Sequence, residues 1–131
     1  MIGLDTNVLV RYLTHDEPMQ YSKAAAFIDA ATGRGEQFVV NTAVLCELVW
    51  VLGTAYDYSR EEIARALEQI FATAQFEVER LDEARQALGD FRSTKAGFGD
   101  AFIGRINRSL GAEHTVTFDR DLQALETFRL L

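Results

Sequence analysis

Short apolar runs alternate with longer amphipathic stretches along the chain. A strand repeats its inward-facing positions every two residues and a helix every 3.6, so the short runs indicate buried strands and the longer stretches indicate helices. We expect strands at Ile2 to Asp5, Phe38 to Val40, Phe76 to Glu79, His114 to Phe118 and, as a last edge strand, Phe128 to Leu131.

Helices fill the intervals between these runs. Ser59 and Glu62 have the spacing of a capping box, and Gly111 is placed to stop the last helix. Because strands that alternate with helices pair in parallel, the pattern predicts an α/β protein, a three-layer α/β/α fold with a central, mostly parallel sheet. The expected helices are Thr6 to Leu13, Pro18 to about Gly33, Ala43 to about Ala55, Ser59 to about Thr73, Asp82 as a cap to about Ser93, and about Asp100 to Leu110.

Length and composition fit a single domain over residues 1–131. Hydrophobic residues make up 48% and charged residues 25%, which is ordinary for a globular protein with its own core. No apolar stretch is long enough to span a membrane, and the first residues lack the pattern of a secretory signal. Cys46 is the only cysteine, so no internal disulfide forms, and we expect a cytoplasmic protein.

The formal net charge of −7 narrows the choice of partners. Proteins that bind nucleic acid through charge alone are usually basic, so the acidic balance excludes that mode of binding. It favours a basic protein partner or bound cations instead. His15 and His114 are isolated from other metal ligands, which tells against zinc.

Glu47 lies within a strongly apolar helical stretch. Its neighbours three and four residues away are all apolar, so no lysine or arginine pairs with it locally. Three interpretations remain open: an exposed residue on a narrow polar stripe, a salt bridge to a distant residue, or a functional group that faces a cavity. Burial of an unpaired carboxylate is costly, and we favour function over a structural ion pair.

Asp5 and Asp119 each follow an apolar strand, and Asp100 lies at the start of a helix. Each has an ordinary explanation as a helix cap or a partner of the helix dipole. The carboxyl ends of parallel strands meet at one edge of a sheet, however, so Asp5 and Asp119 are expected there, with Glu47 and Asp100 in the same cleft. Clustered carboxylates repel one another unless cations neutralise them, and oxygen ligands suit Mg²⁺ or Mn²⁺.

Four motifs resemble the PIN domain family, in particular its small single-domain ribonucleases of the VapC toxin type. They are LDTNVLVRYL, CELVWVL, FGDAFI and TVTFDRDL, in that order across nearly the whole chain. The resemblance implies a PIN-like fold and endonucleolytic cleavage of RNA by a carboxylate-bound metal. Carried over residue by residue, it implies that the catalytic, metal-binding acids are Asp5, Glu47, Asp100 and Asp119, with Thr6, Asn7, Thr117 and Asp121 in support.

The same resemblance implies partners. Relatives of this type are usually homodimers, and a cognate antitoxin with a basic segment silences them. Asp121 follows Asp119 by two residues, so either residue is a candidate for the fourth ligand. Cations expected near the cleft, where some could contact RNA phosphates, are Arg11, Arg92, Lys95, Arg105, Arg108 and Arg120.

Two other readings stay open. Phosphatases of the haloacid dehalogenase type need Asp-x-Asp after the first strand, whereas Asn7 stands at the third position here, and receiver domains use paired acids where Asp5 stands alone. A PIN-like scaffold without activity would act only by contact with protein or RNA. Metal dependence discriminates between that binding module and the enzyme, because contact alone needs no Mg²⁺.

Overall fold

The structure is a computed structural model that describes all residues from 1 to 131. Every expected strand and helix is present, and one short 3₁₀ helix is added near the C-terminus. The elements are β1 (Ile2–Gly3), α1 (Thr6–Thr14), α2 (Pro18–Gly33), β2 (Phe38–Val40), α3 (Thr42–Thr54), α4 (Arg60–Ala72), β3 (Phe76–Val78), α5 (Leu81–Ser93), α6 (Phe98–Ser109), β4 (Thr115–Thr117), η1 (Arg120–Leu122) and β5 (Phe128–Leu130).

Helix starts follow the local sequence in most places. Asp5 caps α1, Asn41 caps α3, and Ser59 forms the expected capping box with Glu62. The prediction that Asp82 caps α5 is wrong. Arg80 takes that position in a left-handed conformation (φ 55°) without a side-chain cap, and Asp82 lies in the first turn, where its charge suits the helix dipole.

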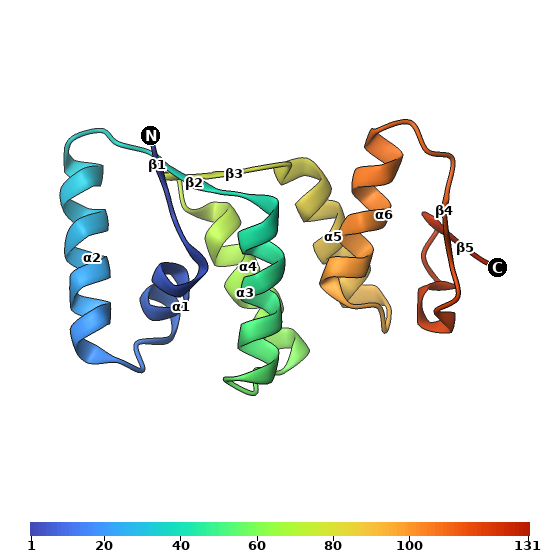
Figure 1. Cartoon of the computed structure of the whole chain (residues 1–131), viewed down its shortest axis with the longest axis horizontal. Helices are drawn as coiled ribbons and strands as arrows, with labels where there is room; N and C mark the ends of the chain where they lie inside the picture. The colour runs from blue at the N-terminus through green and yellow to red at the C-terminus, as the bar shows by residue number, and fades with distance from the viewer.

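The strands pair in parallel throughout, as the alternating pattern predicts, but they form two sheets. One sheet has the order β1-β2-β3, with Ile2 opposite Phe38 and Phe38 opposite Phe76. The other contains only β4 and β5. Figure 1 shows the α5–α6 pair standing between the first sheet, with its helices, and the β4–β5 strands.

A cluster of 28 buried hydrophobic residues forms the core. Leu45, Leu48 and Leu52 contribute one face of α3, and Leu122 and Leu125 belong to the same cluster near the C-terminus. The cluster therefore joins the first sheet to the elements that follow it. None of the helices has the length and apolar character that a membrane span requires.

Arg60 holds the segment that leads into α6. Its guanidinium donates hydrogen bonds of 2.7 Å to the carbonyl oxygens of Phe91 and Ala96 and lies 3.9 Å from the centre of the Phe91 ring. These contacts combine charge-assisted hydrogen bonds with a cation–π interaction. They fix the chain between α5 and α6, and thereby the place at which α6 begins.

Candidate metal centre

Asp100 lies in the first turn of α6, half-buried. The turn before it contains Gly97, where a Cβ would lie 3.6 Å from Oδ2 of Asp100, so the backbone approaches this carboxylate closely. The FGDAFI stretch thus folds into a helix start whose small residues leave room around one acid. The expected helix begins at Asp100, whereas the observed helix begins two residues earlier at Phe98.

Asp119 lies just after β4 and caps η1. Its carboxylate accepts a hydrogen bond of 2.9 Å from the backbone N–H of Asp121, and its own N–H donates to Oγ1 of Thr117 at 3.0 Å. Thr117 and Asp121 therefore orient the loop that carries Asp119. Both are residues for which the sequence predicts a supporting role.

Asp100 and Asp119 interact electrostatically. The pKa of Asp100 is raised above its usual value, first because burial disfavours the charged carboxylate and second because the negative charge of Asp119 acts on it. No cation among the side chains offsets this effect on Asp100. Carboxylate oxygens are the ligands that a hard divalent cation prefers.

Asp5 occupies the carboxyl end of β1 and is exposed. Its Oδ1 accepts a hydrogen bond of 2.8 Å from the N–H of Thr6. Thr6 is buried, whereas Asn7 is exposed on the first turn of α1. Asp5 therefore caps α1 and also lies at the carboxyl end of β1.

The helix that carries Glu47 is not buried on every face, although its sequence is strongly apolar. Glu47 is exposed, on a face of α3 that also carries Ala43 and Trp50, whose side chain is 67% exposed. The buried face of α3 lies elsewhere, at its leucines. No hydrogen bond or ion pair engages Glu47, so the distant salt bridge left open by the sequence is absent.

The four acids do not form one cluster. No group of three or more His, Cys, Asp or Glu side chains lies close enough together to hold a metal ion. The reason is topological, because Asp5 follows a strand of the first sheet and Asp119 follows a strand of the second. The charge of Asp119 acts on the pKa of Asp100, whereas Asp5 and Glu47 are not among the causes of that shift.

Comparison with known proteins identifies the family. The family model described as the PIN domain matches residues 2–127. The chain belongs to the PIN domain family. It is also similar to a VapC ribonuclease of Aquifex aeolicus, with 28% identity over 122 residues that cover 93% of this chain and 90% of the relative. No solved structure matches the chain.

Membership of the PIN family confirms the predicted fold class and the resemblance drawn from the four motifs. The family match spans all of them, from LDTN at the start of the chain to the acids after β4. Within this PIN protein, the α/β elements alternate as expected. The separation of β4–β5 from the first sheet is the feature that the alternating pattern did not predict.

Most of the cations expected near the acids are occupied elsewhere in this PIN protein. Arg105 forms a bidentate pair with Asp90, with both distances at 2.8 Å. Further ion pairs join Arg11 to Asp16, Arg92 to Glu61 and Glu68, and Arg108 to Glu126. These arginines brace the helices to one another or to the chain near the C-terminus.

Arg60 is a residue that sequence reasoning missed. Its acceptors are backbone carbonyls 31 and 36 residues away, so no local spacing signals the contact. Its role is to position the start of α6, and with it Asp100. Two further residues without a predicted role, Lys23 and Phe27, line a pocket beside α1.

Proposed function

We propose that this PIN protein is a metal-dependent endoribonuclease that hydrolyses RNA phosphodiester bonds. The observation that carries the proposal is the Asp100–Asp119 pair, in which one half-buried carboxylate lies in the negative field of another with no compensating cation. The similarity to a protein named as a VapC ribonuclease supports the reaction class.

The residues of the pair have distinct tasks in this proposal. Asp100 and Asp119 hold Mg²⁺ or Mn²⁺ on the side of the attacking water, while Thr117 and Asp121 keep Asp119 in place through the hydrogen bonds of its loop. A divalent ion supplies a more acidic water and stabilises the charge that develops on the leaving 3′ oxygen. Asp5 and Glu47 are the proposed ligands of a second ion, and Thr6 and Asn7 support Asp5.

We further propose that the protein is the toxin of a toxin–antitoxin pair and forms a homodimer. An acidic protein of net charge −7 attracts a basic segment, and a basic antitoxin tail lying over the carboxylates would block RNA. The exposed Trp50 on α3 gives a second copy an apolar side chain to pack against.

One observation favours a second candidate, a catalytically inactive PIN-like binding module. The structure groups two of the four acids and not three or more, so a complete two-metal site is not assembled in it. A binding module acts through contact with protein or RNA and needs no divalent ion. Metal dependence of RNA cleavage therefore separates the two candidates.

The test is incubation of the purified protein, freed of any co-purifying partner, with total RNA in Mg²⁺ or Mn²⁺. We expect cleavage that a chelator abolishes and that Asp100→Asn reduces by at least about a hundredfold, because the substitution removes a ligand charge without changing the side chain's shape. Cleavage that persists in chelator would overturn the metal mechanism. Intact RNA, together with no binding of Mn²⁺ by the protein, would leave the binding module.

A further inference from the structure

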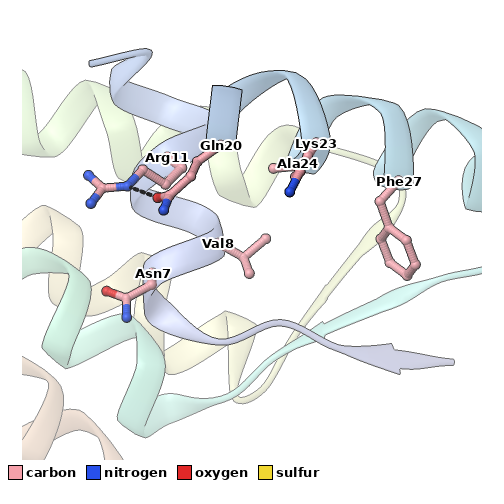
Figure 2. Close-up of a pocket in the computed structure, with 7 residues that line it drawn as sticks. All are labelled: Asn7, Val8, Arg11, Gln20, Lys23, Ala24 and Phe27. Carbon is pink, nitrogen blue, oxygen red and sulfur yellow. Dashed lines mark hydrogen bonds between the residues drawn. The ribbon is translucent and has the colours of Figure 1, made fainter. Parts of the chain in front are cut away.

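A pocket of about 310 Å³ opens between α1 and α2. Figure 2 shows its walls: Val8 and Asn7 project from α1, while Lys23, Ala24 and Phe27 project from α2. This volume is at the lower end of the range of small-molecule sites, and it suits one nucleotide-sized group. The lining residues are Asn7, Val8, Arg11, Gln20, Lys23, Ala24 and Phe27.

The charge of the pocket opposes that of the whole protein. Its lining contains two cations and no carboxylate, although the chain has 20 acidic and 13 basic residues. Arg11 is held by Asp16 and by the hydroxyl of Tyr56. Lys23 makes no hydrogen bond to any other lining residue, so its ammonium is the group free to meet an anion.

The other walls are apolar and aromatic. Phe27 is 49% exposed, and its ring packs edge-on against Phe38, with ring centres 6.3 Å apart. That contact anchors the ring at one edge and leaves part of its surface open beside Val8. An exposed aromatic face next to a cation is the combination on which single-stranded nucleic acids stack their bases and place their phosphates.

The pocket lies next to Asp5, a proposed ligand of the second ion. Asn7 lines it and stands two residues after Asp5, and Val8 stands three residues after Asp5 on the same helix. A rise of 1.5 Å per residue separates Asp5 from Val8 by only about 5 Å along the axis of α1. An RNA strand that reaches Asp5 therefore passes the mouth of the pocket.

From these observations we propose that the α1–α2 pocket binds one unpaired nucleotide of the RNA substrate, with the base against Phe27 and Val8 and a phosphate at Lys23. The inference rests on the proposed function and adds a substrate-binding site to it. An amphipathic helix of a protein partner is the competing occupant. The cationic lining and the position beside Asp5 favour RNA, because they serve a phosphate backbone that passes Asp5, a proposed ligand of the second ion.

The test uses a single-stranded RNA decamer of mixed sequence in which 4-thiouridine replaces uridine. The full-length protein is irradiated with it in chelator, and the cross-linked peptide is mapped by mass spectrometry. Steady-state cleavage of the same RNA in Mn²⁺ is measured for Phe27→Leu and Lys23→Gln. Arg85→Gln, which removes an exposed charge on α5, is the matched control for Lys23→Gln.

We expect cross-links within α1 or α2 and a rise in KM of at least about fivefold for Phe27→Leu and Lys23→Gln, with a smaller change in kcat. The Arg85→Gln control should stay within about twofold of the unmodified protein, and the circular dichroism spectrum of each variant must match that of the unmodified protein. Unchanged KM in both pocket variants would overturn the inference while leaving the proposed function intact. Normal RNA kinetics combined with loss of a co-purifying protein would assign the pocket to a protein partner and overturn it too. Cross-links in the pocket without any cleavage would support the inference and count against the proposed catalysis.

Discussion

At Gly104, α6 packs directly against the chain that enters β5. A Cβ at this position would lie 2.6 Å from Cε2 of Phe128 and would overlap the side chain of Thr127, which is almost fully buried. The Oγ1 atom of Thr127 has no hydrogen-bond partner, so displacement of this side chain breaks no hydrogen bond and the cost of a Cβ at Gly104 is steric. A single missing methyl group therefore sets how closely β4–β5 attach to α6.

We predict that Gly104→Ala lowers the free energy of unfolding by roughly 1–3 kcal/mol, because the added methyl group overpacks the contact. Gly89→Ala is the matched control, since it lies within α5 with no atom within 4 Å of the added Cβ. That control should stabilise the protein by about 0.5–1 kcal/mol through the higher helix propensity of alanine. Urea denaturation measures both values. Equal effects of the two substitutions would contradict the packing described for α6.

Some properties of single residues could be predicted from the sequence, and others could not. Asp100 and Asp119 could be singled out because a motif and a strand end each mark them, and the structure brings them into electrostatic contact. The exposure of Glu47 could not be read from its apolar neighbours, because exposure depends on which elements cover α3. The α1–α2 pocket, which Lys23 and Phe27 line, depends on the angle between α1 and α2, and no local sequence pattern specifies that angle.

At the scale of elements, capping interactions define where helices begin. The cap of α3 is not only local: Glu79, just after β3, accepts a hydrogen bond of 2.9 Å from the N–H of Thr42. A carboxylate at this place also interacts favourably with the positive end of the helix dipole. The pKa of Glu79 is lowered, mainly because of this backbone hydrogen bond.

A lowered pKa makes this interaction depend on pH. Its contribution to stability is present above the pKa of Glu79 in the unfolded chain and is lost as the pH falls through the lowered pKa of the folded state. We predict that Glu79→Gln destabilises the protein at neutral pH by roughly 0.3–1 kcal/mol and that this difference disappears in acid. Thermal unfolding as a function of pH measures the effect.

Glu77→Gln, on the same strand but without such a contact, is the control for the cap. It should leave the pH dependence unchanged. If Glu79→Gln destabilises the protein as much at acidic pH as at neutral pH, the charge of the Glu79 carboxylate is not what stabilises α3.

Element types could be predicted almost completely from the sequence because most of the signals are local. The capping box at Ser59 and the cap at Asn41 depend on side chains that contact their own helix. The prediction that Asp82 caps α5 is wrong because Arg80 takes the cap position in a left-handed conformation. No local sequence signal indicates that conformation at Arg80. Arg80 is one of three non-glycine residues in this molecule with a positive φ.

At the scale of the whole molecule, the division into two sheets is the feature that local patterns could not specify. Parallel pairing follows from alternating strands and helices, but which strands become neighbours depends on contacts between residues far apart in the chain. The sequence therefore predicted one sheet edge for Asp5 and Asp119, and the structure places them after strands of separate sheets (Figure 1).

The uncovered face of α3 gives the whole molecule a fluorescent reporter. Trp50 is the only tryptophan, and it is 67% exposed. We predict that acrylamide quenches its fluorescence efficiently in dilute protein and that quenching weakens as the protein concentration rises and a homodimer covers this face. A protected tryptophan in a species that behaves as a monomer in size-exclusion chromatography would contradict the exposure.

The central claim is that Asp119, paired with Asp100, holds the catalytic metal. The most direct measurement compares RNA cleavage in Mn²⁺ by the unmodified protein, Asp119→Asn and Asp121→Asn. Asparagine can still cap η1, so the first substitution removes the charge and keeps the local hydrogen bond. The account predicts that Asp119→Asn loses cleavage by at least about a hundredfold while Asp121→Asn retains it within about tenfold. Full activity of Asp119→Asn, or loss confined to Asp121→Asn, would contradict it.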